Sequence, residues 1–130
     1  MMFTDWPVEG IDLPPDLLSA GVAVSGIYDF EPILYCSENK GLRMDAEEAR
    51  SVSPIYRSPL TDAPLLISYG ANEPPDMRRQ SEDFFAKFRQ QTKTMEILPV
   101  PEADHFDAVQ VLGTEKSELF ARALSVITAG

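Results

Sequence analysis

The chain has 130 residues, of which 44% are hydrophobic and 25% charged, a balance typical of one globular domain with a moderate core. Its 21 acidic and 11 basic residues give a formal net charge of -10, which repels nucleic acid and anionic lipid and argues against binding to either. The single cysteine, Cys36, excludes an internal disulfide, and with only one histidine it cannot build the usual zinc sites. We therefore expect no metal, no cofactor and a reducing, cytoplasmic location.

The apolar runs are only as long as strands, so the sequence predicts neither a transmembrane helix nor a secretory leader. Residues 5–17 contain three prolines and two acidic turns, which predicts a loop over one end of a sheet. Residues 17–20 are predicted to form a helical turn. Residues 21–26 are a short apolar run between two glycines, which is typical of a buried parallel strand.

Ser25 stands at the exit of this first strand, where a nucleophile could lie. A nucleophile elbow needs glycines two residues before and two residues after the serine, because its strained turn leaves no room for side chains. Those positions hold Ala23 and Ile27 instead. We therefore expect Ser25 to be structural, with its hydroxyl bonded to the backbone of a loop.

A long excursion separates the first strand from the second. Its first part, residues 27–34, is predicted to form a short helix or turn, with Asp29 as N-cap and Pro32 in the first turn. Residues 36–44 show no periodicity and are predicted to lie above the sheet as part of a lid.

The second part of the excursion starts with a short acidic helix over residues 45–50, capped by Asp45. Residues 51–64 are broken by prolines and are predicted to be a loop that leads into the central strand.

The central strand is the apolar run over residues 65–70, which breaks at Gly70. A helix over about residues 75–91 follows it, with Pro75 in its first turn. The helix face predicted to pack on the sheet carries Met77, Ser81, Phe84, Phe85 and Phe88. The opposite, solvated face carries Arg78, Arg79, Glu82, Asp83, Lys87 and Arg89.

A third strand is predicted over residues 94–100, followed by a loop over 101–107. Thr114 is the predicted N-cap of a last helix. The buried stripe of that helix is predicted to be Leu119, Phe120, Ala123, Leu124 and Ile127. Crossovers of this length favour parallel strands, so the fold class predicted is α/β, with a mostly parallel sheet flanked by helices.

Two side chains capable of catalysis follow consecutive strands of this sheet. Glu73 comes after the central strand, and His105, the only histidine, comes after the next one. Parallel strands end at the same edge, where reactive groups gather in open α/β sheets. A carboxylate on one imidazole nitrogen selects the tautomer and stabilises the imidazolium, which leaves the other nitrogen to act as base and acid.

Four segments resemble the C-terminal half of an α/β-hydrolase, in particular the kynurenine formamidase (arylformamidase) and esterase group. They are GVAVSGIYDFEPIL, LRMDAEEARSVSPI, LLISYGANEPPDMRRQSEDF and VPEADHFDAV. The resemblance spans nearly the whole chain. In that family the order along the chain is nucleophilic serine, acid and histidine. The acid position falls on Glu73 and the histidine position on His105.

The resemblance implies a serine hydrolase of N-formyl aryl amides such as N-formylkynurenine, or of small carboxylic esters, with no metal. Many family members have Asp at the acid position. Glu73 carries one more methylene, and Asp76, Asp104 and Asp107 are neighbouring carboxylates that could be taken for the acid.

The family's oxyanion His-Gly-Gly loop and its G-x-S-x-G elbow do not occur in these residues. We therefore expect residues 1–130 to be a single partial domain whose N-terminal half, with the nucleophile, is missing. Such a domain exposes a sheet edge, which favours dimerisation. The competing interpretation is an inactive hydrolase remnant that acts as a non-catalytic or partner-binding domain. Cys36 is a poor substitute nucleophile because it lies in the lid excursion.

Overall fold

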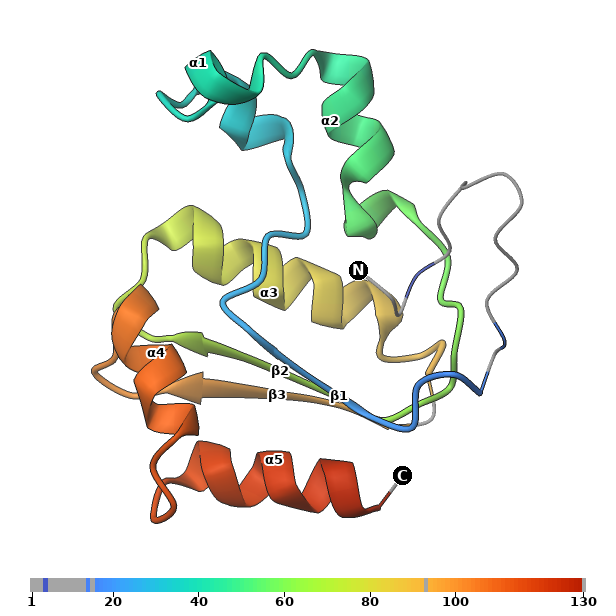
Figure 1. The fold of residues 1–130 in the computed structure, drawn as a ribbon, viewed down its shortest axis with the longest axis vertical. Helices are drawn as coiled ribbons and strands as arrows, with labels where there is room; N and C mark the ends of the chain where they lie inside the picture. Colours follow the sequence, from blue (N-terminus) through green and yellow to red (C-terminus); the bar gives the residue numbers. More distant parts are fainter. Residues whose placement is uncertain (1–3, 5–13, 15, 93, 130) are drawn as a thin grey trace.

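A computed structural model describes Thr4, Pro14, residues 16–92 and residues 94–129. Three parallel strands in the order β1, β2, β3 form its centre, and they span Gly21–Val24, Leu65–Gly70 and Met95–Val100. Helix α3 (Pro75–Phe88) lies on one face of this sheet and helix α5 (Glu118–Thr128) on the other (Figure 1). The predicted α/β fold, a parallel sheet flanked by helices, is therefore confirmed.

The strand register brings the ends of β2 and β3 together. Leu65 pairs with Met95 at one end, and Gly70 pairs with Val100 at the other. All six residues of β2 are buried, as expected of a central parallel strand. Because the two strands end level with each other, the loops that follow them leave the sheet side by side.

Each face of the sheet has its own hydrophobic core, because side chains along a strand alternate between the faces. The core on the α3 side contains Tyr28, Leu65, Ile67, Phe84 and Phe88. The core on the α5 side contains Leu66, Val100, Ala103, Ala108, Leu119, Ala123 and Val126. Burial of each Phe or Leu contributes roughly 1.5–3 kcal/mol, so both helices are held mainly by apolar contact.

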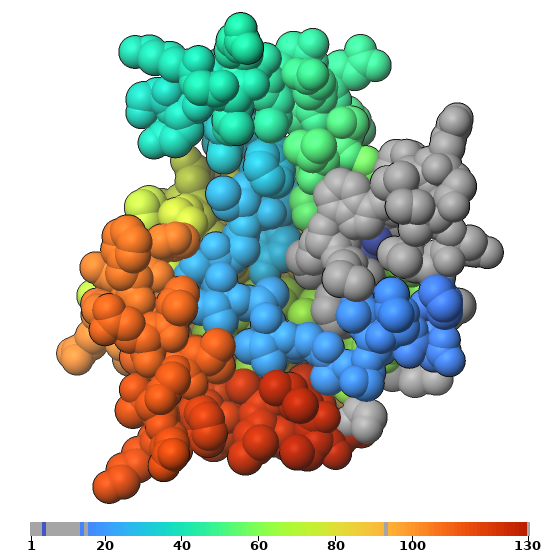
Figure 2. All heavy atoms as spheres, in the orientation of Figure 1, coloured from blue at the N-terminus to red at the C-terminus, as the bar shows by residue number. Residues whose placement is uncertain are grey.

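The excursion between β1 and β2 forms a layer on the far side of α3 (Figures 1 and 2). It contains two short 3₁₀ helices, η1 (Glu31–Tyr35) and η2 (Pro54–Tyr56), and two short α-helices, α1 (Asn39–Leu42) and α2 (Ala46–Val52). Asp45 caps α2 in a capping box with Glu48, which confirms the predicted cap.

The excursion differs in detail from the prediction. Residues 36–44 contain the short helix α1, and α2 continues through Val52 into what was predicted to be loop. The N-cap of η1 is Phe30 and not Asp29, although the Asp29 carboxylate still accepts a hydrogen bond from the Glu31 N–H at 3.0 Å. The side chain of Asp29 therefore bonds to the first residue of η1, although Asp29 lies one residue before the N-cap.

The segment after β3 differs more strongly from the prediction than the excursion does. The predicted loop over 101–107 ends early, because helix α4 (His105–Leu112) starts at the histidine. Thr114 is not the N-cap of the last helix; Ser117 is, and its hydroxyl accepts from the Phe120 N–H at 3.0 Å. Both corrections have one cause, which is that capping side chains at 104 and 117 satisfy the free N–H groups of the helix starts.

The buried stripe of α5 is narrower than predicted. It consists of Leu119, Ala123 and Val126, whereas Leu124 and Ile127 are 52% and 56% exposed. In α3, Phe84 and Phe88 are buried as predicted, and the helix ends at Phe88. A helix that packs on one sheet face buries one stripe at i, i+4 and i+7, and the second stripe stays outside.

Most of the loop predicted over residues 5–17 lies outside the described residues. Residues 17–20 contain bends and no helical turn. None of the described helices combines the length and the apolar character that crossing a lipid bilayer requires.

Candidate active site

The loop after β2 turns back so that Glu73 points into the protein. Its N–H donates to the Gly70 carbonyl at 3.0 Å, which closes a tight turn. Its side chain is fully buried, and carboxylate atom Oε1 accepts the Gly70 N–H at 3.0 Å. A buried carboxylate is costly unless donors surround it. The fold meets this requirement for Oε1, with a backbone donor and a side-chain donor close to the strand end.

The loop after β3 is short and places the histidine at a helix start. Glu102 follows Pro101 with φ +59°, in the left-handed region, so the chain reverses within two residues. Asp104 caps α4. Hydrogen bonds from the N–H groups of Asp107 and Phe106 to this exposed carboxylate lower the pKa of Asp104. His105 is the first residue of α4, so the cap fixes its backbone.

The two loops are bonded to each other. The Ala71 N–H donates to the Val100 carbonyl, and the Asn72 N–H donates to the Ala103 carbonyl, both at 2.9 Å. The Asn72 side-chain amide donates to the Glu102 carbonyl at 3.0 Å. Close approach also requires Gly70, since a Cβ there would lie 2.3 Å from the Ala103 carbonyl oxygen. These contacts hold the acid loop and the histidine loop in one position.

Glu73 and His105 meet where the two loops join. Glu73 Oε2 lies 3.7 Å from His105 Nδ1. Both atoms are buried, and neither has a hydrogen-bond partner. The His105 side chain as a whole is 44% exposed. The imidazole therefore presents one nitrogen to the carboxylate and keeps much of its ring open to solvent. Catalytic contacts in a ligand-free site are often longer than hydrogen bonds and tighten when substrate binds.

Ser25, which directly follows strand β1, contacts the same carboxylate. It has φ +52°, is 8% exposed, and its hydroxyl donates to Glu73 Oε1. The sequence predicted a structural serine bonded to loop backbone, but its partner is the carboxylate. No local pattern in the sequence indicates this pair, because it depends on the strand register: Val24 pairs with Ser68, so Ser25, the residue after β1, lies beside the end of β2.

The segment after Ser25 is held by α3. Gln80 Oε1 accepts the N–H groups of Tyr28 at 2.8 Å and Asp29 at 2.9 Å. The Tyr28 ring stacks on Phe84 with 4.4 Å between centroids, and burial raises the pKa of this phenol. A Cβ at Gly26 would lie 2.6 Å from the Tyr28 ring, so this position favours glycine.

The other carboxylates near the two loops are engaged elsewhere. Asp76 is exposed and contacts the Arg79 guanidinium at 3.3 Å. Asp104 and Asp107 form the capping box of α4. Of the four acidic candidates from the sequence, Glu73 is the one that faces the imidazole Nδ1.

The remaining candidates lie away from this point. Cys36 is exposed at the end of η1 in the excursion, where its thiol donates to the Pro32 carbonyl at 3.4 Å. Within the described residues, no group of three or more His, Cys, Asp or Glu side chains is arranged to hold a metal ion.

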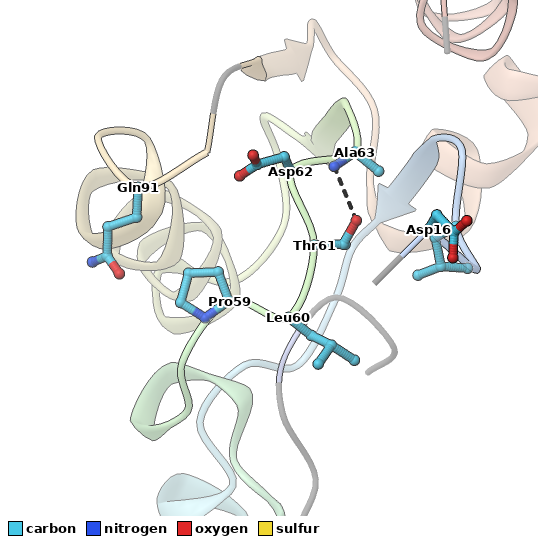
Figure 3. A pocket seen from close by; sticks show the side chains of 8 residues that line it. Asp16, Pro59, Leu60, Thr61, Asp62, Ala63 and Gln91 are labelled. Atoms are coloured by element: carbon cyan, nitrogen blue, oxygen red, sulfur yellow. Dashed lines mark hydrogen bonds between the residues drawn. The ribbon is translucent and has the colours of Figure 1, made fainter. Parts of the chain in front are cut away.

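A large open hollow of about 610 Å³ lies at the opposite end of the sheet, near the start of β2 (Figure 3). Its lining residues are Asp16, Leu18, Pro59, Leu60, Thr61, Asp62, Ala63 and Gln91. Neither Glu73 nor His105 contributes to it. The hollow is therefore separate from the candidate active site.

Comparisons with known proteins identify relatives in sequence and in fold. A kynurenine formamidase of Danio rerio is 30% identical over 132 residues, covering 98% of this chain and 44% of that protein. A kynurenine formamidase of Salmo salar is 31% identical over 119 residues, covering 86% and 39%. The crystal structure of a candidate thioesterase from Silicibacter sp. TM1040 matches with a TM-score of 0.66 and 25% identity, covering 84% of this chain and 38% of that one. No protein-family profile matches the chain.

The fold is that of an α/β-hydrolase. Within that class, the chain is related in sequence to the kynurenine formamidases, which confirms the resemblance noted in the sequence. The chain spans less than half the length of the kynurenine formamidases it matches.

Proposed function

We propose that this chain supplies the acid and the histidine of a serine-hydrolase site that cleaves N-formyl aryl amides or small carboxylic esters. The observation that carries the proposal is the approach of Glu73 Oε2 to His105 Nδ1 at 3.7 Å, with both atoms buried and otherwise unpartnered. Glu73 is the orienting acid and His105 the general base and acid. We place the nucleophilic serine in a part of the complete protein that precedes Gly21.

In this mechanism Glu73 holds a proton on Nδ1, so Nε2 is free to accept the proton of the serine hydroxyl. The serine oxygen bonds to the substrate carbonyl carbon and forms a tetrahedral intermediate. His105 then returns the proton to the leaving amine or alcohol as the carbon–nitrogen or carbon–oxygen bond breaks. Water attacks the acyl-serine in the same way and releases the acid. Glu73 stabilises the imidazolium that forms in both steps.

The substrate class rests on the relatives. Two are kynurenine formamidases by name, and the structural neighbour is a candidate thioesterase. All three names describe transfer of an acyl group to water, from nitrogen in a formamidase and from sulfur in a thioesterase, and an acid–histidine pair that activates a serine can carry out both reactions. We favour the formamide because both sequence relatives carry that name, and we propose a small-molecule substrate in the cytoplasm.

The test uses the protein as its own cells make it, isolated with an antibody against this chain. Its intact mass is measured, and its hydrolysis of N-formylkynurenine, phenyl acetate and an acetyl thioester is assayed. We expect turnover of the formamide or the ester. His105→Ala introduced at the genomic locus should lower kcat/KM by about 10⁴-fold, the size of loss typical when a catalytic triad is disrupted.

A matched pair of acid variants locates the orienting carboxylate. Glu73→Gln should lower kcat strongly, whereas Asp76→Asn, three residues further along in the first turn of α3, should stay near the wild-type rate. Unchanged hydrolysis in His105→Ala or Glu73→Gln would refute the proposal. A mass equal to the 14.4 kDa of the 130 residues together with no turnover would favour the non-catalytic remnant instead.

A further inference from the structure

The two oxygens of the Glu73 carboxylate are used differently. Oε1 accepts two hydrogen bonds, one from the Gly70 N–H at 3.0 Å and one from the Ser25 hydroxyl. Oε2 accepts none and faces His105 Nδ1. A carboxylate alone has two equivalent oxygens, and its last torsion is broad and roughly two-fold. Something outside Glu73 must therefore decide which oxygen meets the imidazole.

The Gly70 N–H lies in the same tight turn as Glu73, three residues before it, so it fixes the carboxylate only relative to that turn. The Ser25 hydroxyl comes from a different strand, 48 residues away along the chain. It approaches Oε1 from the end of β1, so the carboxylate is held between two strands. Its partial positive charge also stabilises an ionised group that has no contact with water.

The backbone of Ser25 points to the same role. Ser25 has φ +52°, a conformation that glycine adopts freely and other residues rarely adopt. Glycine would meet the backbone requirement better but would have no hydroxyl. The side chain therefore has a use here that outweighs the backbone preference.

We propose that Ser25 is a positioning residue of the hydrolase site: its hydroxyl fixes Glu73 Oε1 and thereby directs Oε2 to His105 Nδ1. This inference rests on the proposed pairing of Glu73 with His105. Ser25 acts through Glu73 and is not itself the nucleophile. Loss of its hydroxyl frees the carboxylate to rotate and weakens the selection of the Nδ1–H tautomer.

The test is direct because His105 is the only histidine in the 130 residues. The chain is labelled with ¹⁵N-histidine, and the ¹⁵N chemical shifts at a pH where the imidazole is neutral report which nitrogen carries the proton. The wild-type protein should show mainly the Nδ1–H tautomer. Glu73→Gln should shift the population toward Nε2–H, the tautomer preferred by free histidine.

Two variants of Ser25 separate the hydroxyl from the backbone. Ser25→Ala removes the hydroxyl and keeps the strained φ, whereas Ser25→Gly removes the hydroxyl and relaxes the strain. Both should raise the Nε2–H share several-fold in the same direction as Glu73→Gln. Ser68→Ala is the control, because Ser68 is a fully buried serine whose hydroxyl donates to the Leu98 carbonyl and does not contact Glu73. It should leave the wild-type tautomer unchanged.

The outcomes distinguish the two proposals. If Glu73→Gln shifts the tautomer and neither Ser25 variant does, the pairing stands and the role of Ser25 is refuted. A shift in only one of the two Ser25 variants assigns the effect to backbone strain and also refutes it. If Glu73→Gln has no effect, both proposals fail. In the active enzyme, Ser25→Ala should lower kcat by up to about 100-fold with little change in KM, as expected for a misplaced catalytic group.

Discussion

The two ends of the parallel sheet are organised in opposite ways. At the end where the strands finish, which we call the organised end, three loops are bonded together around one buried carboxylate and one histidine. At the end where β2 begins, an open hollow of about 610 Å³ is lined by residues of loops and by Gln91. The comparison separates a candidate site that is defined by polar contacts from a hollow to which neither Glu73 nor His105 contributes.

Gly70→Ala should break the organised end most severely. The new Cβ would lie 2.3 Å from the Ala103 carbonyl oxygen and 2.6 Å from that of Asp104. Both are backbone atoms, so the acid loop and the histidine loop must separate. We expect the free energy of unfolding to fall by about 3 kcal/mol in urea titrations followed by circular dichroism. Gly41→Ala is the control, because a Cβ there meets nothing within 4 Å. Equal stability of the two variants would contradict the close approach.

Gln80→Leu tests whether α3 supports the organised end. The change removes the acceptor of the Tyr28 and Asp29 N–H groups and leaves a buried donor without a partner. We expect a loss of about 2 kcal/mol in the free energy of unfolding and faster amide exchange at Tyr28. The exposed Gln90→Leu is the matched control and should change stability by less than about 0.5 kcal/mol. Slow exchange at Tyr28 in Gln80→Leu would show that another group holds this segment.

Asp104→Ala tests how the stability that the Asp104 cap gives to the start of α4 depends on pH. The pKa of Asp104 is lower in the folded protein than its ordinary value of 3.8, because the N–H groups of Asp107 and Phe106 bond to its ionised form. Its contribution to stability is therefore complete above that ordinary value and is lost as the pH falls through the lower folded pKa.

The thermal midpoint of Asp104→Ala should thus lie below the wild-type midpoint at neutral pH, and the gap should close in acid. Asp104→Asn is the control, because asparagine caps a helix equally well but does not titrate. A gap that stays constant from neutral pH into acid would show that the charge of Asp104 does not contribute.

The smallest effect is expected at the opposite end of the sheet. Gln91→Ala removes an exposed side chain that lines the hollow. We expect the free energy of unfolding to change by less than about 0.5 kcal/mol and kcat/KM to stay at the wild-type value. A fall in kcat/KM of tenfold or more would place substrate contacts in the hollow. The end of the sheet where β2 begins would then take part in the reaction.

Much of the scaffold follows from local pattern. The apolar runs predicted β1, β2 and β3, and the capping residue Asp45 predicted the start of α2, because strands and caps depend on neighbouring residues. The parallel order then placed Glu73 and His105 at one edge. The start of α4 and the cap of α5 were missed because several nearby side chains can cap a helix and only packing on the sheet selects among them.

The amino-acid sequence by itself determined the three parallel strands, the helix between the second and third, and the edge at which the acid and the histidine lie. Only the tertiary structure decided that Glu73 is fully buried, that Oε2 faces Nδ1, and that the Ser25 hydroxyl holds Oε1. The physical reason is distance along the chain. Hydrophobic periodicity depends on residues that are close together in the sequence. The contact between Ser25 and Glu73 joins residues 48 positions apart, and it forms only when the strands pair in the observed register.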